Sequence, residues 1–212
     1  MHRRQWVQLT VVVVTLIAVW TCAGWLLTHA LSGSRLVHGD QSISAWFARH
    51  RTPGWNRLTG IGSMLADTVV KIVVTAIIAI AMLVYWKRWR EPLMVVIPLV
   101  LEALCFIVVT TLVGRPRPTI ALDASPVDSS YPSGHMAAAV AYAAIVVVVF
   151  WRTPRRSVRT AAVLVAVALA FAVGFSRLYR GMHYSTDIVM GGLLGGLCVV
   201  ATAMILRRTE QR

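Results

Sequence analysis

The residues best suited to chemistry lie in a polar run near the C-terminal end of the chain, at residues 176–187, between two strongly apolar segments. His183 and Asp187 are four residues apart, so their side chains would share one face of a helix that begins here. The carboxylate could then accept a hydrogen bond from one imidazole nitrogen and leave the other free as a nucleophile. Arg177 and Arg180 add permanent positive charge, and planar guanidinium groups favour phosphate as the group attacked. A connecting loop whose polar residues merely cap a helix is the alternative.

Two further polar motifs flank apolar segments. Arg115 and Arg117 lie in a proline-stiffened turn, which by itself is typical of an interfacial anchor. Ser133 and Gly134 stand just before a predicted helix, where a capping hydroxyl, free N–H groups and the helix dipole could bind an anion. His135 follows directly. A capping serine beside an unrelated histidine would explain this motif alone, but the convergence of all three motifs favours an active site.

The composition is that of a membrane protein. Of 212 residues, 58% are hydrophobic and only 14% are charged, and the mean hydropathy is +0.70. The net charge of +13 could suggest nucleic acid. However, the Lys and Arg residues sit in short clusters at the ends of apolar runs, so we expect the lipid bilayer as partner and no nucleic acid.

The apolar runs predict an all-α fold, a six-transmembrane-helix bundle forming a single domain over residues 1–212. A signal peptide is the alternative for the first run, but that run is long enough to span and lacks a small-residue cleavage site. Between the first two spans, Ile43, Trp46 and Phe47 follow helical spacing, which predicts a short amphipathic helix on the membrane surface. The expected spans are residues 6–27, 58–86, 93–113, 136–151, 160–175 and 188–206.

The distribution of positive charge predicts the orientation. Six spans place both chain ends on one side of the membrane. That side carries twelve Lys and Arg, at both ends of the chain and at residues 87–90 and 152–159, whereas the opposite loops carry eight. The positive-inside rule therefore predicts a multi-pass protein of the cell membrane with cytoplasmic termini and every polar motif on the extracytoplasmic face.

Taken together, the motifs resemble those of the type 2 phosphatidic acid phosphatases. This superfamily also includes lipid phosphate phosphatases, bacterial polyprenyl diphosphate phosphatases and vanadium haloperoxidases. The resemblance covers about residues 58–206. One position departs from the pattern, because the Lys that normally stands seven residues before the Arg-Pro pair is Thr110 here. A phosphate-binding cation is thus missing, and Arg115 is the nearby candidate to replace it. The matching residues are Arg117-Pro118, then Pro132-Ser133-Gly134-His135, then Ser176-Arg177 with His183 and Asp187 at the family's spacing.

The resemblance implies a membrane-embedded lipid phosphate phosphatase that works through a phosphohistidine intermediate. His183 would attack phosphorus while Asp187 fixes its tautomer, and His135 would protonate the leaving group and later activate water. No cofactor and no metal are expected, because two-metal phosphatases need clustered carboxylates and the chain has only eight acidic residues. The expected phosphate-binding residues are Arg117, Ser133, Gly134, Arg177 and Arg115.

A site at the ends of membrane helices favours an amphiphilic substrate. Candidates are phosphatidic acid, phosphatidylglycerol phosphate, and a polyprenyl phosphate or diphosphate. The alternative is a non-catalytic protein that binds or transports lipid phosphates, and Thr110 is the best support for it. A binder needs the arginines but has no use for an oriented imidazole.

Three charged residues fall inside the expected spans, where isolated charges are costly. Lys71 and Glu102 are expected at similar depth on the second and third spans, and Asp67 precedes Lys71 by one helical turn. We therefore expect Lys71 to pair with Glu102, Asp67 or both, in a structural role. The alternative is that these groups face separate polar pockets or water.

Overall fold

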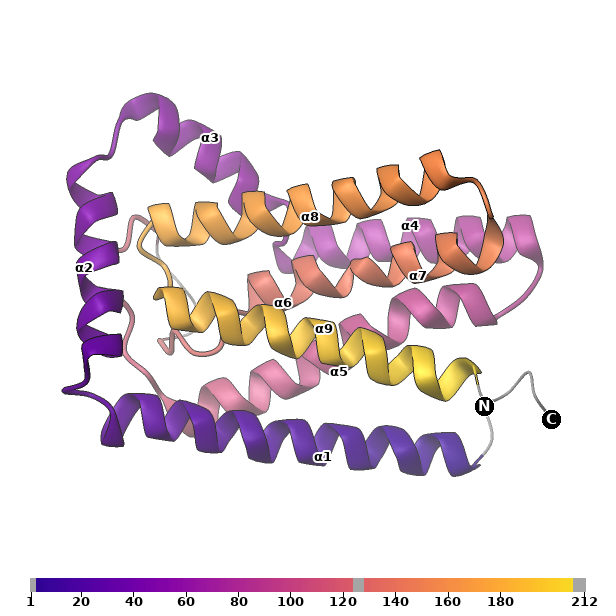
Figure 1. Cartoon of the computed structure of the whole chain (residues 1–212), viewed down its shortest axis with the longest axis horizontal. Helices are drawn as coiled ribbons and strands as arrows, with labels where there is room; N and C mark the ends of the chain where they lie inside the picture. Colours follow the sequence, from indigo (N-terminus) through magenta and orange to yellow (C-terminus); the bar gives the residue numbers. More distant parts are fainter. Residues whose placement is uncertain (1–2, 124–127, 208–212) are drawn as a thin grey trace.

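The computed structural model describes residues 3–123 and 128–207, and within those ranges it is helical, with no named strand. Six segments are long and apolar enough to cross a membrane. They run along the long axis of the molecule, and both termini lie at the same end (Figure 1). The expected all-α class and the number of spans are therefore confirmed. The six segments are Arg3–Ala30, Thr68–Trp86, Arg90–Val113, Gly134–Arg152, Arg156–Tyr179 and Ser185–Arg207.

The last helix, α9 (Ser185–Arg207), is the centre of the bundle and packs against α1 (Arg3–Trp25), α5 (Arg90–Val113) and α6 (Gly134–Ala141). Glycines on α9 permit the closest of these contacts. A Cβ atom at Gly191 would lie 2.3 Å from the Ser133 carbonyl oxygen, and one at Gly195 would lie 2.1 Å from that of Ala137. Small residues thus bring the start of α6 directly against α9, as in other tightly packed membrane helices.

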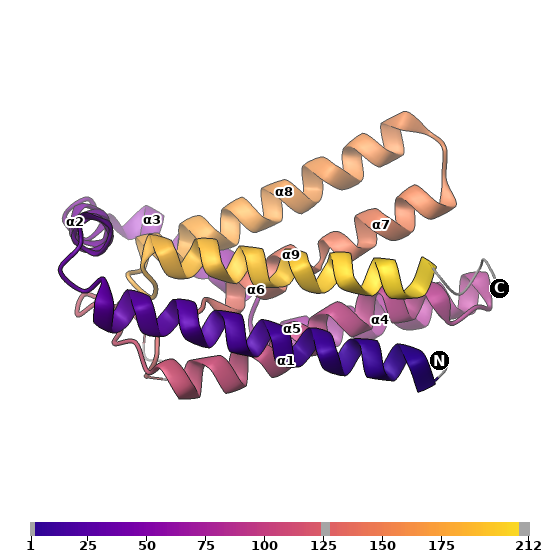
Figure 2. The ribbon, with the colours of Figure 1, turned by 60° about the horizontal axis from the view of Figure 1, so that its bottom comes forward.

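The amphipathic helix expected between the first two spans is α2 (Arg35–Arg49). It follows α1 and the π-helical turn Leu26–Ala30, and the hydroxyl of Ser34 caps its first turn. Figures 1 and 2 show α2 lying across the end of the bundle opposite the termini. Its buried residues are Val37, Asp40 and Ser44, whereas Leu36, Ile43 and Trp46 are exposed.

The expected second span is wrong at its beginning. The apolar run at residues 58–86 is not one helix but two, α3 (Pro53–Met64) and α4 (Thr68–Trp86). Helix α3 leans against α8 (Arg156–Tyr179), where Gly62 fits so closely that a Cβ atom would lie 2.3 Å from Ser176 Oγ. Asp67 stands in extended conformation at the N-cap of α4, a position that favours Asp. Asp67 is therefore at a helix start and not deep within a continuous span.

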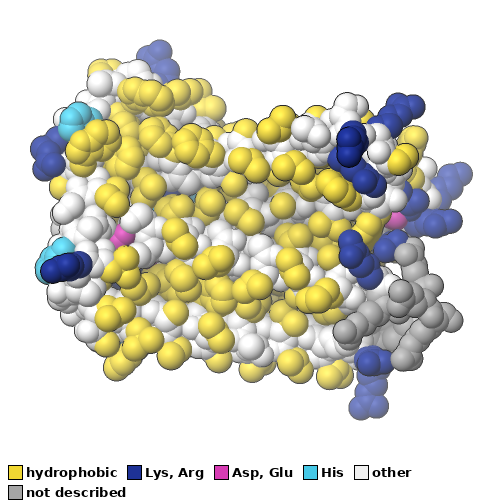
Figure 3. Space-filling view, viewed as in Figure 1, with side chains coloured by type: hydrophobic (Ala, Val, Ile, Leu, Met, Phe, Trp, Pro, Cys, Tyr) yellow, Lys and Arg dark blue, Asp and Glu magenta, His cyan; other side chains and the backbone are white. Residues whose placement is uncertain are grey.

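The remaining span is made of α6 and α7 (Ala143–Arg152), which follow one another directly. In the space-filling view, hydrophobic side chains cover the flank of the bundle (Figure 3). Lys and Arg gather mainly at the end where the termini lie, with smaller groups near α2. An apolar flank between two polar ends is the surface that a bilayer requires.

Among the charged residues expected inside the spans, Lys71 and Glu102 form the expected pair. Lys71 Nζ on α4 lies 2.8 Å from Glu102 Oε1 on α5, and the two side chains are 16% and 1% exposed. Asp67 does not join them, because its carboxylate contacts His135 instead. The second carboxylate oxygen of Glu102 has no hydrogen-bond partner among the described residues, so Lys71 is the main compensation for a buried charge.

We predict that Lys71→Met and Glu102→Gln each destabilise the protein. Removing one partner of a buried ion pair leaves the other charge uncompensated, at a cost of about 3–5 kcal/mol. The double variant should cost clearly less than the sum of the single variants, because it leaves no stranded charge. Unfolding free energies in detergent micelles would test this, and strictly additive effects would show that the pair contributes no coupling.

Candidate active site

The three polar motifs meet at the end of the bundle that α2 covers. Backbone hydrogen bonds hold them together, because Ser133 N donates to the Asp187 carbonyl oxygen at 3.1 Å and Ser130 N donates to that of Arg115 at 2.7 Å. The loop between α8 and α9 carries His183 into this junction. Residues about 70 positions apart in the chain, such as Arg115 and Asp187, are therefore in direct contact.

His183 is almost fully buried, with 2% of its surface exposed. Its Nδ1 lies 2.7 Å from the carbonyl oxygen of Ser130. Because a carbonyl oxygen only accepts hydrogen bonds, Nδ1 must carry the proton and Nε2 keeps its lone pair. The expectation that Asp187 holds this ring is therefore wrong: a backbone carbonyl fixes the tautomer, and the carboxylate serves another purpose.

Asp187 lies in the first turn of α9 and is fully buried. Its Oδ2 accepts a hydrogen bond from Tyr184 N at 2.9 Å, and its Oδ1 accepts one from Arg115 at 2.6 Å. The first contact ties the carboxylate to the backbone next to His183, which is the normal use of an acidic residue at a helix start. Asp187 thus shapes the loop that carries His183 and does not touch the imidazole through a hydrogen bond in the structure.

Arg115 has protein partners that the sequence did not reveal. Its two terminal nitrogens donate to carboxylates, Nη1 to Asp187 and Nη2 to Asp40 Oδ2 at 3.0 Å, and only 4% of the residue is exposed. Nη1 also donates to the hydroxyl of Thr186 at 2.7 Å, and the guanidinium lies 4.4 Å from the Tyr184 ring centre. These contacts give the guanidinium a structural role, and the expectation that it also replaces the Lys missing at Thr110 stays a prediction.

The electrostatic environment keeps His183 neutral. Burial lowers its pKa well below the ordinary value, and the positive charges of Arg177 and Arg117 lower it further. The hydrogen bond to Ser130 acts in the opposite direction but does not reverse the effect. The imidazole is therefore unprotonated at neutral pH, as a nucleophile must be.

Arg177 and Arg117 are the cations next to this imidazole. Arg177, 5% exposed at the end of α8, donates from Nη1 to the hydroxyl of Ser63 at 2.7 Å. Its Nε has no hydrogen-bond partner within the described part of the chain, which leaves a buried donor for an anion. Arg117 donates from Nη1 to the Met182 carbonyl oxygen at 2.6 Å, immediately before His183. Burial lowers the pKa of Arg117, although nearby Asp187 opposes this.

Ser133 caps α6 as expected, since its hydroxyl accepts a hydrogen bond from Met136 N at 3.4 Å. Packing also favours glycine at position 134, because a Cβ atom there would lie 3.0 Å from the ring of Phe106 on α5. The expected approach of a phosphate to Gly134 stays a prediction. The positive end of α6 still faces the same junction as His183.

His135, the expected general acid, has a partner that the sequence did not reveal. Its Nε2 lies 2.9 Å from Asp67 Oδ1, at the break between α3 and α4. The side chains of His135 and Asp67 are 26% and 49% exposed, in contrast to the buried His183. A carboxylate that accepts from Nε2 leaves Nδ1 to exchange a proton with substrate or water.

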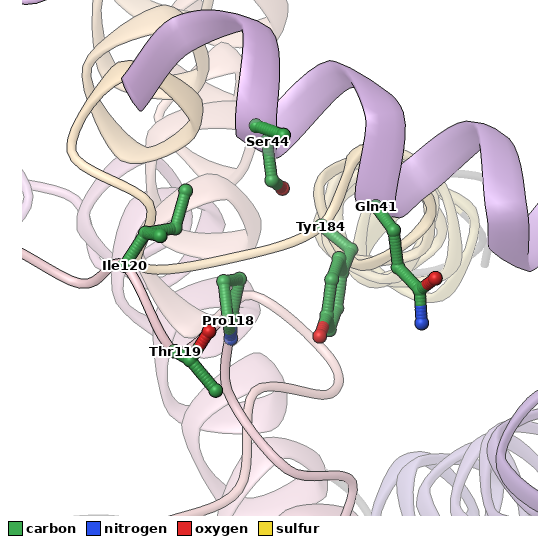
Figure 4. Close-up of a pocket in the computed structure, with 7 residues that line it drawn as sticks. Gln41, Ser44, Pro118, Thr119, Ile120 and Tyr184 are labelled. Carbon is green, nitrogen blue, oxygen red and sulfur yellow. The ribbon is translucent and has the colours of Figure 1, made fainter. Parts of the chain in front are cut away.

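A small cavity of about 120 Å³ separates α2 from the turn that follows Arg117 (Figure 4). The side chains that line it are uncharged, and the hydroxyl of Ser44, which has no hydrogen-bond partner among the described residues, points into it. The lining residues are Gln41, Ser44, Ala45, Pro118, Thr119, Ile120 and Tyr184.

Four contributors to the site were missed from the sequence. Asp40 was not singled out, and Asp67 was expected inside a span as a partner of Lys71; the charge of each was the available signal. Ser63 was hidden inside the run taken as one span. Ser130 acts through its backbone carbonyl, for which residue type gives no signal. Within the described ranges, no three His, Cys, Asp or Glu residues cluster in a way that could hold a metal ion.

Comparison with known proteins identifies the family of the chain. Residues 92–210 match the PAP2 superfamily. The chain is 31% identical to phosphatidylglycerophosphatase B of Bacillus subtilis, over 80% of this chain and 84% of that one. It is 28% identical to an undecaprenyl-diphosphatase of Sulfolobus acidocaldarius, over 76% and 78% of the two chains.

Two solved structures are similar in fold. The crystal structure of a transmembrane PAP2-type phosphatidylglycerolphosphate phosphatase from Bacillus subtilis has a TM-score of 0.75 and 25% identity, and the match covers 97% of this chain and 96% of that one. LpxE from Aquifex aeolicus has a TM-score of 0.58 and 22% identity, with 76% and 92% coverage, and supports the fold alone.

The burial of neutral His183 predicts a pH dependence of stability. The pKa of His183 in the folded state lies well below the ordinary 6.5. As the pH falls below 6.5, His183 therefore becomes protonated in the unfolded chain but stays neutral in the folded chain. Stability should therefore decrease by about 1.4 kcal/mol per pH unit below that point. Asn at position 183 can still donate to the Ser130 carbonyl but does not titrate, so His183→Asn should lose this part of the slope.

Unfolding in micelles at several pH values between 7.5 and 5 would measure the difference. The exposed His38 supplies a control, since His38→Asn should keep the wild-type slope. An unchanged slope in His183→Asn would show that His183 is not held neutral.

Proposed function

We propose that this chain, which belongs to the PAP2 superfamily, is a membrane-embedded phosphatase that hydrolyses lipid phosphates through a phosphohistidine on His183. The family is one of lipid phosphate hydrolases, and phosphohistidine chemistry is general to it. The observation that carries the residue assignment is the state of His183: buried, neutral, protonated on Nδ1 by its contact with Ser130, and flanked by two guanidinium groups.

In the first step, Nε2 of His183 attacks phosphorus in line with the leaving oxygen. The N–P bond forms as the P–O bond to the lipid breaks, and protonated His135 transfers its proton to the departing oxygen. The carboxylate of Asp67 stabilises the imidazolium before transfer, a role that its 2.9 Å contact supports. Arg177 and Arg117 offset the charge on the equatorial oxygens, which is the main electrostatic requirement of phosphoryl transfer.

In the second step, water replaces the histidine. His135, now neutral, removes a proton from the water as its oxygen attacks phosphorus, and the N–P bond breaks to release inorganic phosphate and regenerate His183. Acid–base assistance of this kind is worth roughly 10²–10⁴-fold in rate. The greater exposure of His135 and Asp67 supports this assignment, because the second step needs access to water.

The substrate is an amphiphile whose phosphate reaches the bundle end while its tails stay in lipid. Phosphatidic acid, phosphatidylglycerol phosphate and polyprenyl phosphates or diphosphates all have this form. Helix α2 marks the membrane surface at this end, and the stronger cationic clusters lie at the other. By the positive-inside rule, the termini are cytoplasmic and the active site is extracytoplasmic.

A protein that merely binds or transports lipid phosphates is the competing function. The absence of the family Lys at Thr110 favours it, since the nearby cation Arg115 is paired with the carboxylates of Asp40 and Asp187. A binder, however, gains nothing from a neutral imidazole of fixed tautomer or from a His135–Asp67 pair. Catalysis accounts for both features.

We predict that the purified wild type releases phosphate from at least one lipid phosphate in the presence of EDTA, and that His183→Ala abolishes turnover while retaining lipid binding. The arginines remain in this variant, so ground-state binding should persist. A panel of the four lipid classes, assayed for phosphate release and for binding, would test both parts. Turnover above a few per cent of wild type in His183→Ala would refute the nucleophile, and activity lost in EDTA would refute the metal-free mechanism.

We also predict that Asp67→Asn lowers kcat by about 10–100-fold, with a smaller effect than His135→Ala, because the imidazolium loses its stabilising partner but remains in place. The alkaline limb of the kcat profile, where the general acid His135 loses its proton, should move to lower pH, because the imidazolium would no longer be stabilised by a carboxylate. Asp128→Asn, which removes an exposed carboxylate, is the control. A wild-type profile in Asp67→Asn would show that the contact has no part in proton transfer.

A further inference from the structure

Asp40 is a buried carboxylate that none of the three motifs contains. It lies on α2, is 1% exposed, and both of its oxygens point at the beginning of α9. Oδ1 accepts a hydrogen bond from Thr186 N at 3.1 Å and another from the hydroxyl of Ser185. Oδ2 accepts from the hydroxyl of Thr186 and, at 3.0 Å, from Arg115 Nη2.

Through these contacts, a residue of α2 caps the N-terminus of α9. The first N–H groups of a helix need an acceptor, and a Ser, Thr, Asp or Asn just before the helix normally provides it. For α9 the acceptor comes from Asp40, 146 residues earlier in the chain. A negative charge at this position also opposes the positive end of the helix dipole.

The same carboxylate is linked to both sides of His183. On one side, Arg115 connects Asp40 to Asp187, whose other oxygen holds Tyr184 N next to the nucleophile. On the other side, the Arg115 carbonyl holds Ser130 N, and the Ser130 carbonyl holds His183 Nδ1. Through Arg115, Asp40 is thus linked to both backbone segments that hold the imidazole, although it does not contact the imidazole itself.

We propose that Asp40 is a positioning residue for the phosphatase reaction, and that it makes the interfacial helix α2 a functional part of the active site. By holding Ser185, Thr186 and Arg115 together, it sets where Nε2 of His183 stands relative to the phosphate. This inference rests on the proposed function. In-line attack is sensitive to geometry, because a misplacement of about 1 Å in a catalytic group can cost roughly 100-fold in rate.

The test is Asp40→Asn, which keeps the size of the side chain. One amide oxygen can still accept from α9, but the NH₂ group that replaces the other oxygen cannot accept from Arg115. We expect kcat on the preferred lipid phosphate to fall by about 10–100-fold, while KM changes by less than about threefold because the phosphate-binding arginines remain. Rates should be expressed per active site, from the amplitude of the first-turnover burst.

Glu91 supplies a matched control at the opposite end of the bundle. It is a buried carboxylate, 1% exposed, that forms an ion pair with Arg152. Glu91→Gln should lower the melting temperature at least as much as Asp40→Asn does, yet leave kcat per active site unchanged. A purely structural role for Asp40 would make the two variants behave alike.

Thr186→Val is a second, milder variant that decides the matter if Asp40→Asn does not fold. It removes one hydroxyl, which donates to Asp40 and accepts from Arg115 Nη1, but keeps the charges of Asp40 and Arg115. It should give an intermediate loss of kcat with unchanged KM. Wild-type kcat per active site in whichever variants fold would overturn the positioning role. A wild type that releases no phosphate from any lipid would instead overturn the proposed function, so the two failures are distinguishable.

Discussion

The guanidinium of Arg115, buried between Asp40 and Asp187, is the interaction on which the rest of the site depends. Removing three charges from water is costly, and only full pairing compensates for it. Here each terminal nitrogen of Arg115 meets a carboxylate, and the remaining carboxylate oxygens accept from hydroxyl and backbone donors. These ion pairs therefore fix the helix on the membrane surface, the turn after α5 and the start of α9 relative to one another. Movement of any one of the three would leave a buried charge unpaired.

This constraint also separates the cations into two kinds. Arg115 directs three of its N–H donors to the protein, two from Nη1 to Thr186 and Asp187 and one from Nη2 to Asp40. Arg177, by contrast, keeps a buried Nε without a partner among the described residues, beside an imidazole whose pKa its charge helps to lower. The nearest arginine to the family's missing Lys is thus held mainly by the protein's own carboxylates. Thr110 itself is buried, and its hydroxyl has no partner in the described chain.

Hydropathy and length were enough to predict the six spans and the surface helix, because the bilayer imposes those constraints directly on composition. The break between α3 and α4 was missed because a hydropathy average over residues 58–86 does not register one N-cap aspartate. The same break places the carboxylate of Asp67 within hydrogen-bond distance of His135. The spacing of His183 and Asp187 predicted that both share one helix face, but α9 begins at Ser185 and leaves His183 in the preceding loop. The hydrogen-bond acceptor of the imidazole is a backbone carbonyl, which every residue type possesses.

The two histidines differ in exposure in the way that a two-step hydrolysis requires. His183 is 2% exposed, and attack on phosphorus benefits from a dry environment, where the charges of Arg177 and Arg117 are weakly screened. His135 and Asp67 reach the surface, where the protonated leaving group can depart and water can enter. A fully buried pair would trap the phosphoenzyme, and a fully exposed pair would weaken the electrostatic stabilisation of the transferring phosphoryl group. The break in the second span matters for this reason: it places a carboxylate at the boundary between the buried nucleophile and solvent, where one histidine can serve both steps.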